Sequence, residues 1–278
     1  MICVVTMTKT DLSADYPLGH TDAEHERLIR QAKQVAPITE RFFREAGIGP
    51  GQRVLDLGSG VGDVAMLVAR LVGSSGEVVA IERDRNSIAK ARARVTAAGL
   101  HNVFFNESNV NEILDDKPFD AAVGRFILMY LPDPVATLRS ISRVVRPGGV
   151  IVFQEPTWVP VIAHLQALPL WFATASLIDK TMRVSANHDM GAELYHTFVE
   201  AGLPAPTVRM ELPMGKEPYL AQWYHDTLSS LLPQVEQLHM PIESVGPLDT
   251  LVERLQKEVE SSKTVACWFA SVGAWCRK

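Results

Sequence analysis

Short apolar runs alternate with stretches of helical periodicity through the middle of the chain. The runs are rich in valine, leucine, isoleucine and alanine, which is typical of strands buried on both faces of a sheet. Expected strands lie at 53–57, 78–82, 103–106, 120–124 and 150–154, with expected helices at 64–72, 86–98 and 134–145. Five such β-α repeats joined by short loops predict a mostly parallel sheet that is covered by helices on both faces.

The two ends of the chain follow a different pattern. A helix is expected at 22–45, where Thr21 and Glu24 have capping-box spacing. Further helices are expected at 191–201, 219–232 and 248–260, and strands at 207–212 and 265–270. The late strands lack the crossover pattern, so we expect an antiparallel, hairpin-like pair that completes a seven-stranded sheet. The prediction is therefore a Rossmann-like, doubly wound α/β fold.

We interpret residues 1–278 as a single domain. Its expected parts are an N-terminal cap helix within 1–50, a core at 51–156, and helical lid insertions at 157–190 and 216–262. The segment from Trp158 to Ile178 carries no formally charged residue and is long enough to span a bilayer. Pro160, Pro169 and its position directly after a sheet strand favour apolar helices that cover a pocket, so no membrane span is expected.

Composition narrows the possible functions. The net charge of −5 and the isoelectric point near 5.9 argue against a nucleic-acid partner, because such binding needs a basic face. The three cysteines, Cys3, Cys267 and Cys276, have the spacing of neither a disulfide framework nor a metal site. With no signal peptide expected at the N-terminus, they indicate reduced thiols in a cytoplasmic protein.

A glycine-rich turn follows the first expected strand, in the sequence Val54 to Asp63. Its glycines stand at 58, 60 and 62, whereas a dinucleotide site has the spacing G-x-G-x-x-G. Asp63 takes the place of the third glycine, and its carboxylate would repel a pyrophosphate. Together with Asp56, it suits a cationic ligand without phosphate, although Asp56 could instead cap the amides of the turn. A nicotinamide oxidoreductase is therefore disfavoured.

The second expected strand ends at Glu82, at the distance where an acidic side chain accepts both hydroxyls of a ribose in Rossmann-like sites. Asp84 stands closer to the next helix and is better placed to cap its N-terminus. The glycine turn and Glu82 together indicate an adenosine-containing cofactor.

From Arg53 to Pro156 the motifs resemble, in order, those of class I S-adenosylmethionine-dependent methyltransferases, particularly the small-molecule and quinone-type branch. VLDLGSGVGD resembles the first motif, VVAIERD the second, FDAAVGRFILMYLPDP the fourth-strand motif and LRSISRVVRPGGVIVF the segment after it. The resemblance implies S-adenosyl-L-methionine as cofactor and S-adenosyl-L-homocysteine as product. The residues implied to bind it are Tyr16, Arg27, Gln31, Asp56, Gly58, Ser59, Gly60, Gly62, Asp63, Glu82, Arg83, Asn109, Val110, Arg125 and Phe126.

The chain departs from this family at two places. Asn109 stands where the family usually has an aspartate against adenine, and Gly124-Arg125 replaces small polar residues. Arg125 could contact the cofactor through its backbone, hold the methionine carboxylate with its side chain, or face solvent. Arg27 and Gln31, one helical turn apart, either face the methionine moiety or form an exposed polar surface.

Methyl transfer is an in-line displacement that depends mainly on alignment in a water-poor pocket, so the sequence identifies no catalytic residue and no metal site. If a base is needed, the candidates are His20, His164, His188, Tyr130 and Glu155. The residues expected to line an apolar or aromatic acceptor site are Trp158, Leu165, Leu168, Leu170, Trp171 and Phe172. The expected function is methylation of a small molecule by a monomer or homodimer. The alternative is a methyltransferase-fold protein that acts as a non-methylating enzyme or a cofactor-binding module.

Overall fold

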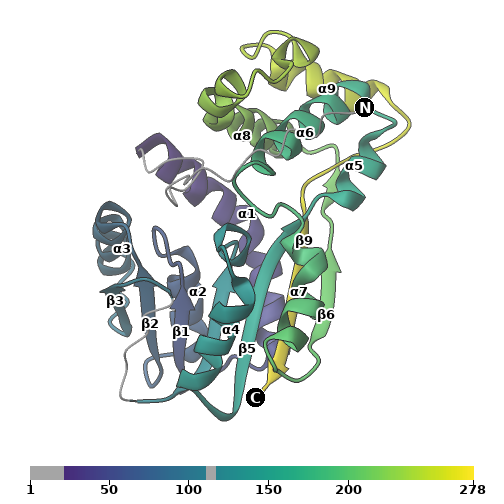
Figure 1. Cartoon of the computed structure of the whole chain (residues 1–278). Helices are drawn as coiled ribbons and strands as arrows, with labels where there is room; N and C mark the ends of the chain where they lie inside the picture. The colour runs from purple at the N-terminus through teal and green to yellow at the C-terminus, as the bar shows by residue number, and fades with distance from the viewer. Residues whose placement is uncertain (1–21, 111–116) are drawn as a thin grey trace.

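A computed structural model describes residues 22–110 and 117–278 of the chain. In this part of the chain the main sheet has seven strands in the order β3-β2-β1-β4-β5-β9-β6 (Figure 1). Their bounds are β1 Arg53–Leu57, β2 Glu77–Glu82, β3 Val103–Glu107, β4 Phe119–Arg125, β5 Val145–Thr157, β6 Thr207–Glu211 and β9 Ala270–Arg277. The first five are parallel, and β9 runs antiparallel to both β5 and β6. The Rossmann-like, doubly wound plan is thus confirmed.

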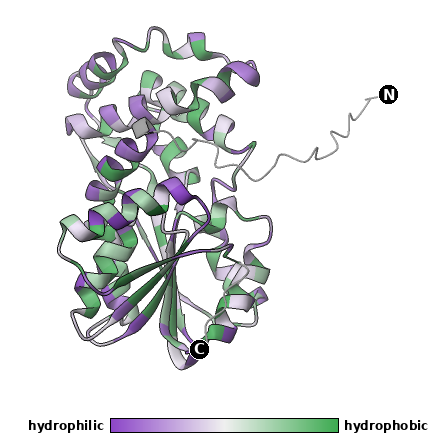
Figure 2. Cartoon of the chain, turned by 90° about the vertical axis from the view of Figure 1, so that its left-hand side faces the viewer, coloured by the Kyte–Doolittle hydropathy of each residue, from purple (hydrophilic) through white to green (hydrophobic). Residues whose placement is uncertain are grey.

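Helices cover both faces of the sheet, because neighbouring strand residues point to opposite faces. Val54 packs with α1 Asp22–Ala46, α2 Asp63–Val72 and α3 Arg85–Ala97. Leu55 packs in the core that includes α4 Pro134–Val144 and α7 Met190–Glu200. In Figure 2 the strands are mostly coloured as hydrophobic and lie between helices on either side. This two-faced burial explains why the strands read as nearly continuous apolar runs.

The remaining helices gather beyond the upper ends of the strands in Figure 1, where the parallel strands have their carboxyl ends. They are α5 Val159–Leu165, α6 Pro169–Met182, α8 Pro218–Gln237 and α9 Leu251–Ser261, with short elements η2 Ile242–Val245, β7 Met214–Gly215 and β8 Ala266–Cys267. We call this group the cap. Within the described ranges, no helix is both long enough and apolar enough to cross a membrane.

Trp171 shows how the cap is held together. The side chain is 1% exposed, its ring packs edge-on against Tyr224 of α8 at 5.1 Å, and its Nε1 donates to the carbonyl of Leu255 in α9 at 2.9 Å. One residue therefore ties three helices of the cap together.

The last strand differs from the expectation. The strand expected at 265–270 is a two-residue strand, β8, followed by the long strand β9 at 270–277, which inserts between β5 and β6. β9 is buried on both faces and includes small residues, so it has no alternating pattern to recognise. Gly273 shows why small residues are needed, since a Cβ there would lie 2.6 Å from the ring of Phe42 in α1.

Two helix starts follow the local chemistry of the sequence. The Asp84 side chain accepts a hydrogen bond from the Ser87 amide at 2.7 Å, which confirms Asp84 as the N-terminal capping residue of α3. Asp133 accepts a hydrogen bond from the Ala136 amide at the start of α4. Of the expected capping box, Thr21 lies outside the described residues. The Glu24 carboxylate accepts hydrogen bonds from Arg27 and Ser230.

Candidate cofactor and acceptor pocket

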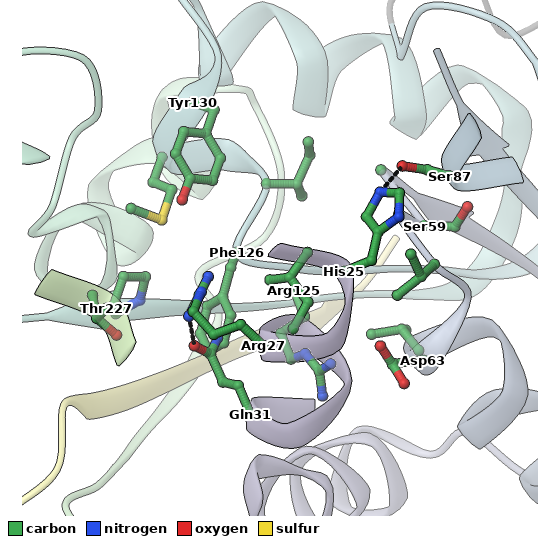
Figure 3. Close-up of a pocket in the computed structure, with 18 of the residues that line it drawn as sticks. His25, Arg27, Gln31, Ser59, Asp63, Ser87, Arg125, Phe126, Tyr130 and Thr227 are labelled. Atoms are coloured by element: carbon green, nitrogen blue, oxygen red, sulfur yellow. Dashed lines mark hydrogen bonds between the residues drawn. The ribbon is translucent and has the colours of Figure 1, made fainter. Parts of the chain in front are cut away.

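A pocket opens where the carboxyl ends of β1, β2, β4 and β5 meet α1 and the cap. We call one part of it the turn half, formed by the glycine turn after β1 together with Glu82, Arg83 and Ser87. The other part is the aromatic half, formed by Phe126, Trp158, Trp223 and Phe269 with the neighbouring residues Met129, Tyr130, Met182 and His188. In Figure 3, Ser59, Asp63 and Ser87 lie on the opposite side of the pocket from Tyr130 and Thr227.

The glycine turn gives the pocket its floor. Gly58 has φ +62°, a left-handed conformation that glycine adopts without steric cost. A Cβ at Gly58 would also lie 2.5 Å from Cδ1 of Ile127. The turn is anchored to the second strand by the Ser59 amide, which donates to the carbonyl of Ile81 at 3.0 Å.

Glu82 closes the same turn from the side. One carboxylate oxygen accepts the Gly60 amide at 2.9 Å, and the other accepts the amides of Arg83 at 2.8 Å and Asp84 at 3.0 Å. Each carboxylate oxygen can accept more than one hydrogen bond, so Glu82 can hold the turn and still receive hydroxyl groups from a ligand in the pocket.

Two charged residues that line the pocket have partners outside its lining. Asp63 forms an ion pair with Arg94 at 2.6 Å, and Arg125 donates to Oγ1 of Thr39 at 3.1 Å. Burial lowers the pKa of Arg125, while the charges of Asp63 and Asp56 act in the opposite direction. Burial raises the pKa of Asp56 well above its usual range, opposed chiefly by Arg125. Arg125 thus lines the pocket with its guanidinium balanced mainly by Asp63.

Helix α1 places a polar pair across the pocket. Arg27 donates to both oxygens of Glu24 and, at 2.8 Å, to Oε1 of Gln31. The same Gln31 oxygen accepts the Nε1 hydrogen of Trp223 at 2.9 Å. Arg27 and Gln31 line the pocket together, and Figure 3 shows the hydrogen bond between them. Through Trp223 this hydrogen-bond chain connects α1 to the cap at the point where the two halves meet.

Three buried polar atoms beside the pocket test its fit to a polar ligand. Within the two described ranges, Nδ1 of His25, Oγ of Ser59 and Oγ1 of Thr227 have no hydrogen-bond partner, and all three residues line the pocket. Unpartnered buried polar groups are costly in proteins. Rotation of these side chains turns the polar atoms toward the pocket, where the hydroxyl, amine and carboxylate groups of S-adenosylmethionine would pair with them.

The aromatic half is built from rings that contact one another. Phe126 packs edge-on against Phe269 with ring centroids 5.3 Å apart. The ring centroid of Trp223 lies 5.2 Å from that of Phe269 and 6.2 Å from that of Trp158. Phe126 has φ +55°, which is unusual for a bulky residue. Its backbone is held by the amide hydrogen bond from Phe126 to the carbonyl of Gln154 at 2.9 Å.

Glu155 secures the loop after Phe126. Its carboxyl oxygens accept the amides of Ile127 at 3.0 Å, Leu128 at 2.9 Å and Met129 at 3.4 Å. Burial raises the pKa of Glu155 to about 8, although the three amides act to lower it. Glu155 does not line the pocket, so this base candidate lies behind the wall of the site.

The structure brings most of the expected cofactor residues together. Those that line the pocket are Arg27, Gln31, Gly58, Ser59, Gly60, Asp63, Glu82, Arg83, Arg125 and Phe126. Asp56, Gly62, Asn109 and Val110 lie outside its lining, with Asp56 buried beneath the turn and Gly62 at the start of α2. Tyr16 and the base candidate His20 lie outside the described residues.

The expected acceptor residues are corrected by the structure. Of the six, only Trp158 lines the pocket. Leu165, Leu168 and Trp171 are almost fully buried within the cap, because they hold its helices together. His164 is likewise outside the lining, with its Nε2 2.8 Å from the carbonyl oxygen of Val265.

Sequence reasoning missed several residues of the lining, among them His25, Ser87, Met182, Trp223, Thr227 and Phe269. His25 approaches Ser87 with 3.2 Å between Nε2 and Oγ (Figure 3). Helical spacing could have found two of them, since Trp223 and Thr227 lie four residues apart on one face of α8. Within the described residues, no group of three histidine, cysteine, aspartate or glutamate side chains is arranged to hold a metal ion.

Comparison with known families identifies the class of protein that this fold and pocket define. A family model described as a methyltransferase domain matches residues 48–202. The chain therefore belongs to this methyltransferase-domain family.

Individual relatives agree with this assignment. The chain is similar to an uncharacterised 37.1 kDa protein in transposon TN4556 of Streptomyces fradiae, with 32% identity over 222 residues, 69% of this chain and 63% of that protein. It is also 35% identical over 120 residues to the ubiquinone/menaquinone biosynthesis C-methyltransferase UbiE of Vibrio vulnificus, covering 41% of this chain and 46% of UbiE. The chain thus spans less than two thirds of the length of both relatives.

A solved structure of a putative methyltransferase from Bacillus halodurans has the same fold. It superposes with a TM-score of 0.55 at 18% sequence identity, over 86% of this chain and 97% of that one.

Proposed function

We propose that the chain transfers a methyl group from S-adenosylmethionine to a small apolar or aromatic acceptor by in-line displacement. The observation that carries this proposal is the continuity of the pocket, which joins the glycine turn and Glu82 to a wall of aromatic rings beneath the cap. Such a pocket can hold a polar cofactor and an apolar acceptor side by side, which supports the proposal.

The turn half is assigned to the cofactor. Glu82 would accept the ribose hydroxyls, and the Gly58–Gly60 backbone would lie against the ligand. Arg125, Arg27 and Gln31 would receive the methionine end, where a guanidinium suits a carboxylate. Asn109 and Val110 are assigned to the adenine side, Tyr16 to the cover over the cofactor, and Asp56, Gly62 and Asp63 to the shape and charge of the turn.

The aromatic half is assigned to the acceptor. The bound cofactor supplies an electrophilic methyl group, and this chain supplies alignment and exclusion of water. Phe126, Trp158, Trp223 and Phe269 offer rings against which a flat, apolar molecule can pack. UbiE is named as a methyltransferase of ubiquinone and menaquinone biosynthesis, and a quinone ring is a flat acceptor of this kind.

Calorimetric titration and a metabolite screen test the proposal. S-adenosylhomocysteine should bind and NAD should not, and mass spectrometry of a cell extract supplied with cofactor should detect a compound that gains one methyl group. Tight binding of NAD without binding of S-adenosylhomocysteine would contradict the cofactor assignment. Binding without transfer to any metabolite would favour a cofactor-binding module or a non-methylating enzyme.

The proposal extends to the domain organisation, the oligomeric state and the location of the protein. We infer one functional unit over 1–278, with its cofactor core at 51–156 and lid insertions at 157–190 and 216–262. We infer a monomer or homodimer that acts in the cytoplasm without a nucleic-acid partner. The net charge of −5 and the buried free thiols of Cys267 and Cys276 support these inferences.

A further inference from the structure

His188 and Asp179 form a hydrogen-bonded pair at the aromatic half of the pocket. Nδ1 of His188 lies 3.1 Å from Oδ1 of Asp179, and the imidazole stacks on Trp158 with ring centroids 4.6 Å apart. His188 lines the pocket, although the residue is only 5% exposed. The stacking and the hydrogen bond together fix the plane and the direction of the ring.

The hydrogen bond also selects the tautomer of His188. The carboxylate of Asp179 accepts a second hydrogen bond from Nε of Arg183 at 3.0 Å. A carboxylate has no hydrogen to donate, so Nδ1 of His188 is the donor and Nε2 carries the lone pair. Among the described residues nothing bonds to Nε2, and it is not one of the sealed, unpartnered polar atoms. The lone pair is therefore open to the pocket.

The surroundings of His188 keep it ready to accept a proton. Burial lowers its pKa, Asp179 and Asp189 raise it, and Arg183 lowers it. These are the charged groups that face it from α6, from the turn after α6 and from the residue before α7, while Trp158 on the β5 side is uncharged. Since an ordinary histidine pKa is about 6.5, the net lowering leaves the imidazole neutral at pH 7.

We propose that His188, oriented by Asp179, is the general base that removes the proton from an aromatic hydroxyl of the acceptor. This inference rests on the proposed methyl transfer. The O–H bond breaks and its proton goes to Nε2 as the oxygen bonds to the methyl carbon, and the electron pair of the broken sulfur–carbon bond returns to sulfur. The products are a methyl ether, a neutral thioether and an imidazolium that faces Asp179, so no other reactant is required.

The other base candidates are less suited to this step. Tyr130 lines the pocket, but a neutral phenol is a much weaker proton acceptor than a neutral imidazole. Glu155 is occupied by three backbone amides behind the pocket wall. The aromatic hydroxyl follows from Phe126 and Tyr130, because these rings line the same pocket as His188 and are only partly buried, so a second ring can pack against them.

The test uses phenol, 1-naphthol and their nitro-substituted derivatives as acceptors, with radiolabelled S-adenosylmethionine. For the hydroxyarenes that are protonated at pH 7, His188→Gln should lower kcat/KM about 100-fold, within the usual range for loss of a general base. The loss should shrink for nitro derivatives that are already ionised, and it should shrink as the pH rises. Asp179→Asn should show the same dependence on acceptor acidity. His196→Gln is the matched control, since that side chain is exposed and pairs only with Glu200 on the surface in the described structure.

Further measurements separate loss of the base from loss of cofactor binding or of folding. The absorbance of a nitro derivative bound to protein loaded with S-adenosylhomocysteine should show easier ionisation in the wild type than in His188→Gln. S-adenosylhomocysteine affinity and melting temperature should change little in the variants. An equal loss for neutral and ionised acceptors, or no loss, would overturn the base assignment.

The remaining outcomes separate this inference from the proposed function. If S-adenosylhomocysteine binds but the wild type methylates none of the hydroxyarenes, the aromatic-hydroxyl assignment is wrong while methyl transfer stands. If S-adenosylhomocysteine does not bind, the proposed function itself fails and this inference fails with it.

Discussion

The two halves of the pocket are built in different ways. The turn half comes from two short segments, 58–64 and 82–87, whose backbone amides and carboxylate bond to each other directly. The aromatic half is assembled from side chains just after β4 and β5, at the carboxyl end of α6, between α6 and α7, on α8 and just before β9. The difference suggests that cofactor binding depends on local backbone geometry, whereas acceptor choice depends on how the cap packs. Disturbing each half separately tests this division.

The largest effect is expected in the core of the cap. Trp171→Ala should lower the free energy of unfolding by about 3–5 kcal/mol, the usual cost of removing a buried tryptophan. The change also removes the Nε1 hydrogen bond to the carbonyl of Leu255. Chemical denaturation measures this. Phe172→Ala is the comparison and should cost less, since Phe172 is only partly buried.

The outcome decides whether α6 is a packing element or a substrate contact. Protein with Trp171→Ala that remains folded should bind S-adenosylhomocysteine nearly as tightly as the wild type, because Trp171 does not line the pocket. Unchanged stability together with weakened acceptor binding would mean that Trp171 reaches the acceptor, contrary to its place in the structure.

The next effect concerns the turn half alone. Glu82→Ala should weaken binding of S-adenosylhomocysteine by at least about 1.5 kcal/mol, because charge-assisted hydrogen bonds to the ribose are lost. Asp84→Ala should do much less to affinity, since Asp84 caps α3 through the Ser87 amide. Calorimetry on both variants measures the difference, and equal losses would mean that the ribose lies elsewhere.

The same division explains what the sequence could predict. The strands of the core, the glycine turn and Glu82 lie within local patterns, so their fold and most of the turn half could be inferred. Trp223, Thr227 and Phe269 come to line the same pocket as Trp158 only after the chain returns through the cap. No local pattern encodes such a meeting. For the same reason the sequence predicts a pocket wall in the aromatic stretch after β5, whereas most of that stretch packs inside the cap.

The pH dependence of stability should reveal the buried carboxyl group of Glu155 behind the loop after Phe126. Burial raises the pKa of Glu155 to about 8 from 4.5, so the folded protein holds a proton there that the unfolded chain releases between these pH values. Stability from this group is therefore present below pH 4.5 and is lost as the pH rises to about 8, by up to about 1.4 kcal/mol per pH unit.

Glu155→Gln provides the comparison for that titration. Denaturation from pH 5 to 8 should show a shallower decline in this variant than in the wild type, although Asp56, whose pKa is also raised by burial, contributes equally to both. An identical slope in the two proteins would contradict the placement of a protonated Glu155 behind residues 127–129.

The smallest effect is expected at the contact between the halves, where Trp223 donates to Oε1 of Gln31 at 2.9 Å. In a double-mutant cycle with Gln31→Ala and Trp223→Phe, the coupling free energy in unfolding should be about 0.5–1.5 kcal/mol, the net value of one hydrogen bond. Because Arg27 donates to the same Gln31 oxygen, loss of Trp223 leaves that oxygen partnered and keeps the coupling modest. Gln31→Ala should weaken S-adenosylhomocysteine binding through the displaced Arg27, whereas Trp223→Phe should change acceptor binding more than cofactor binding. A coupling near zero, with both variants affecting cofactor and acceptor equally, would show that the two halves do not meet through this bond.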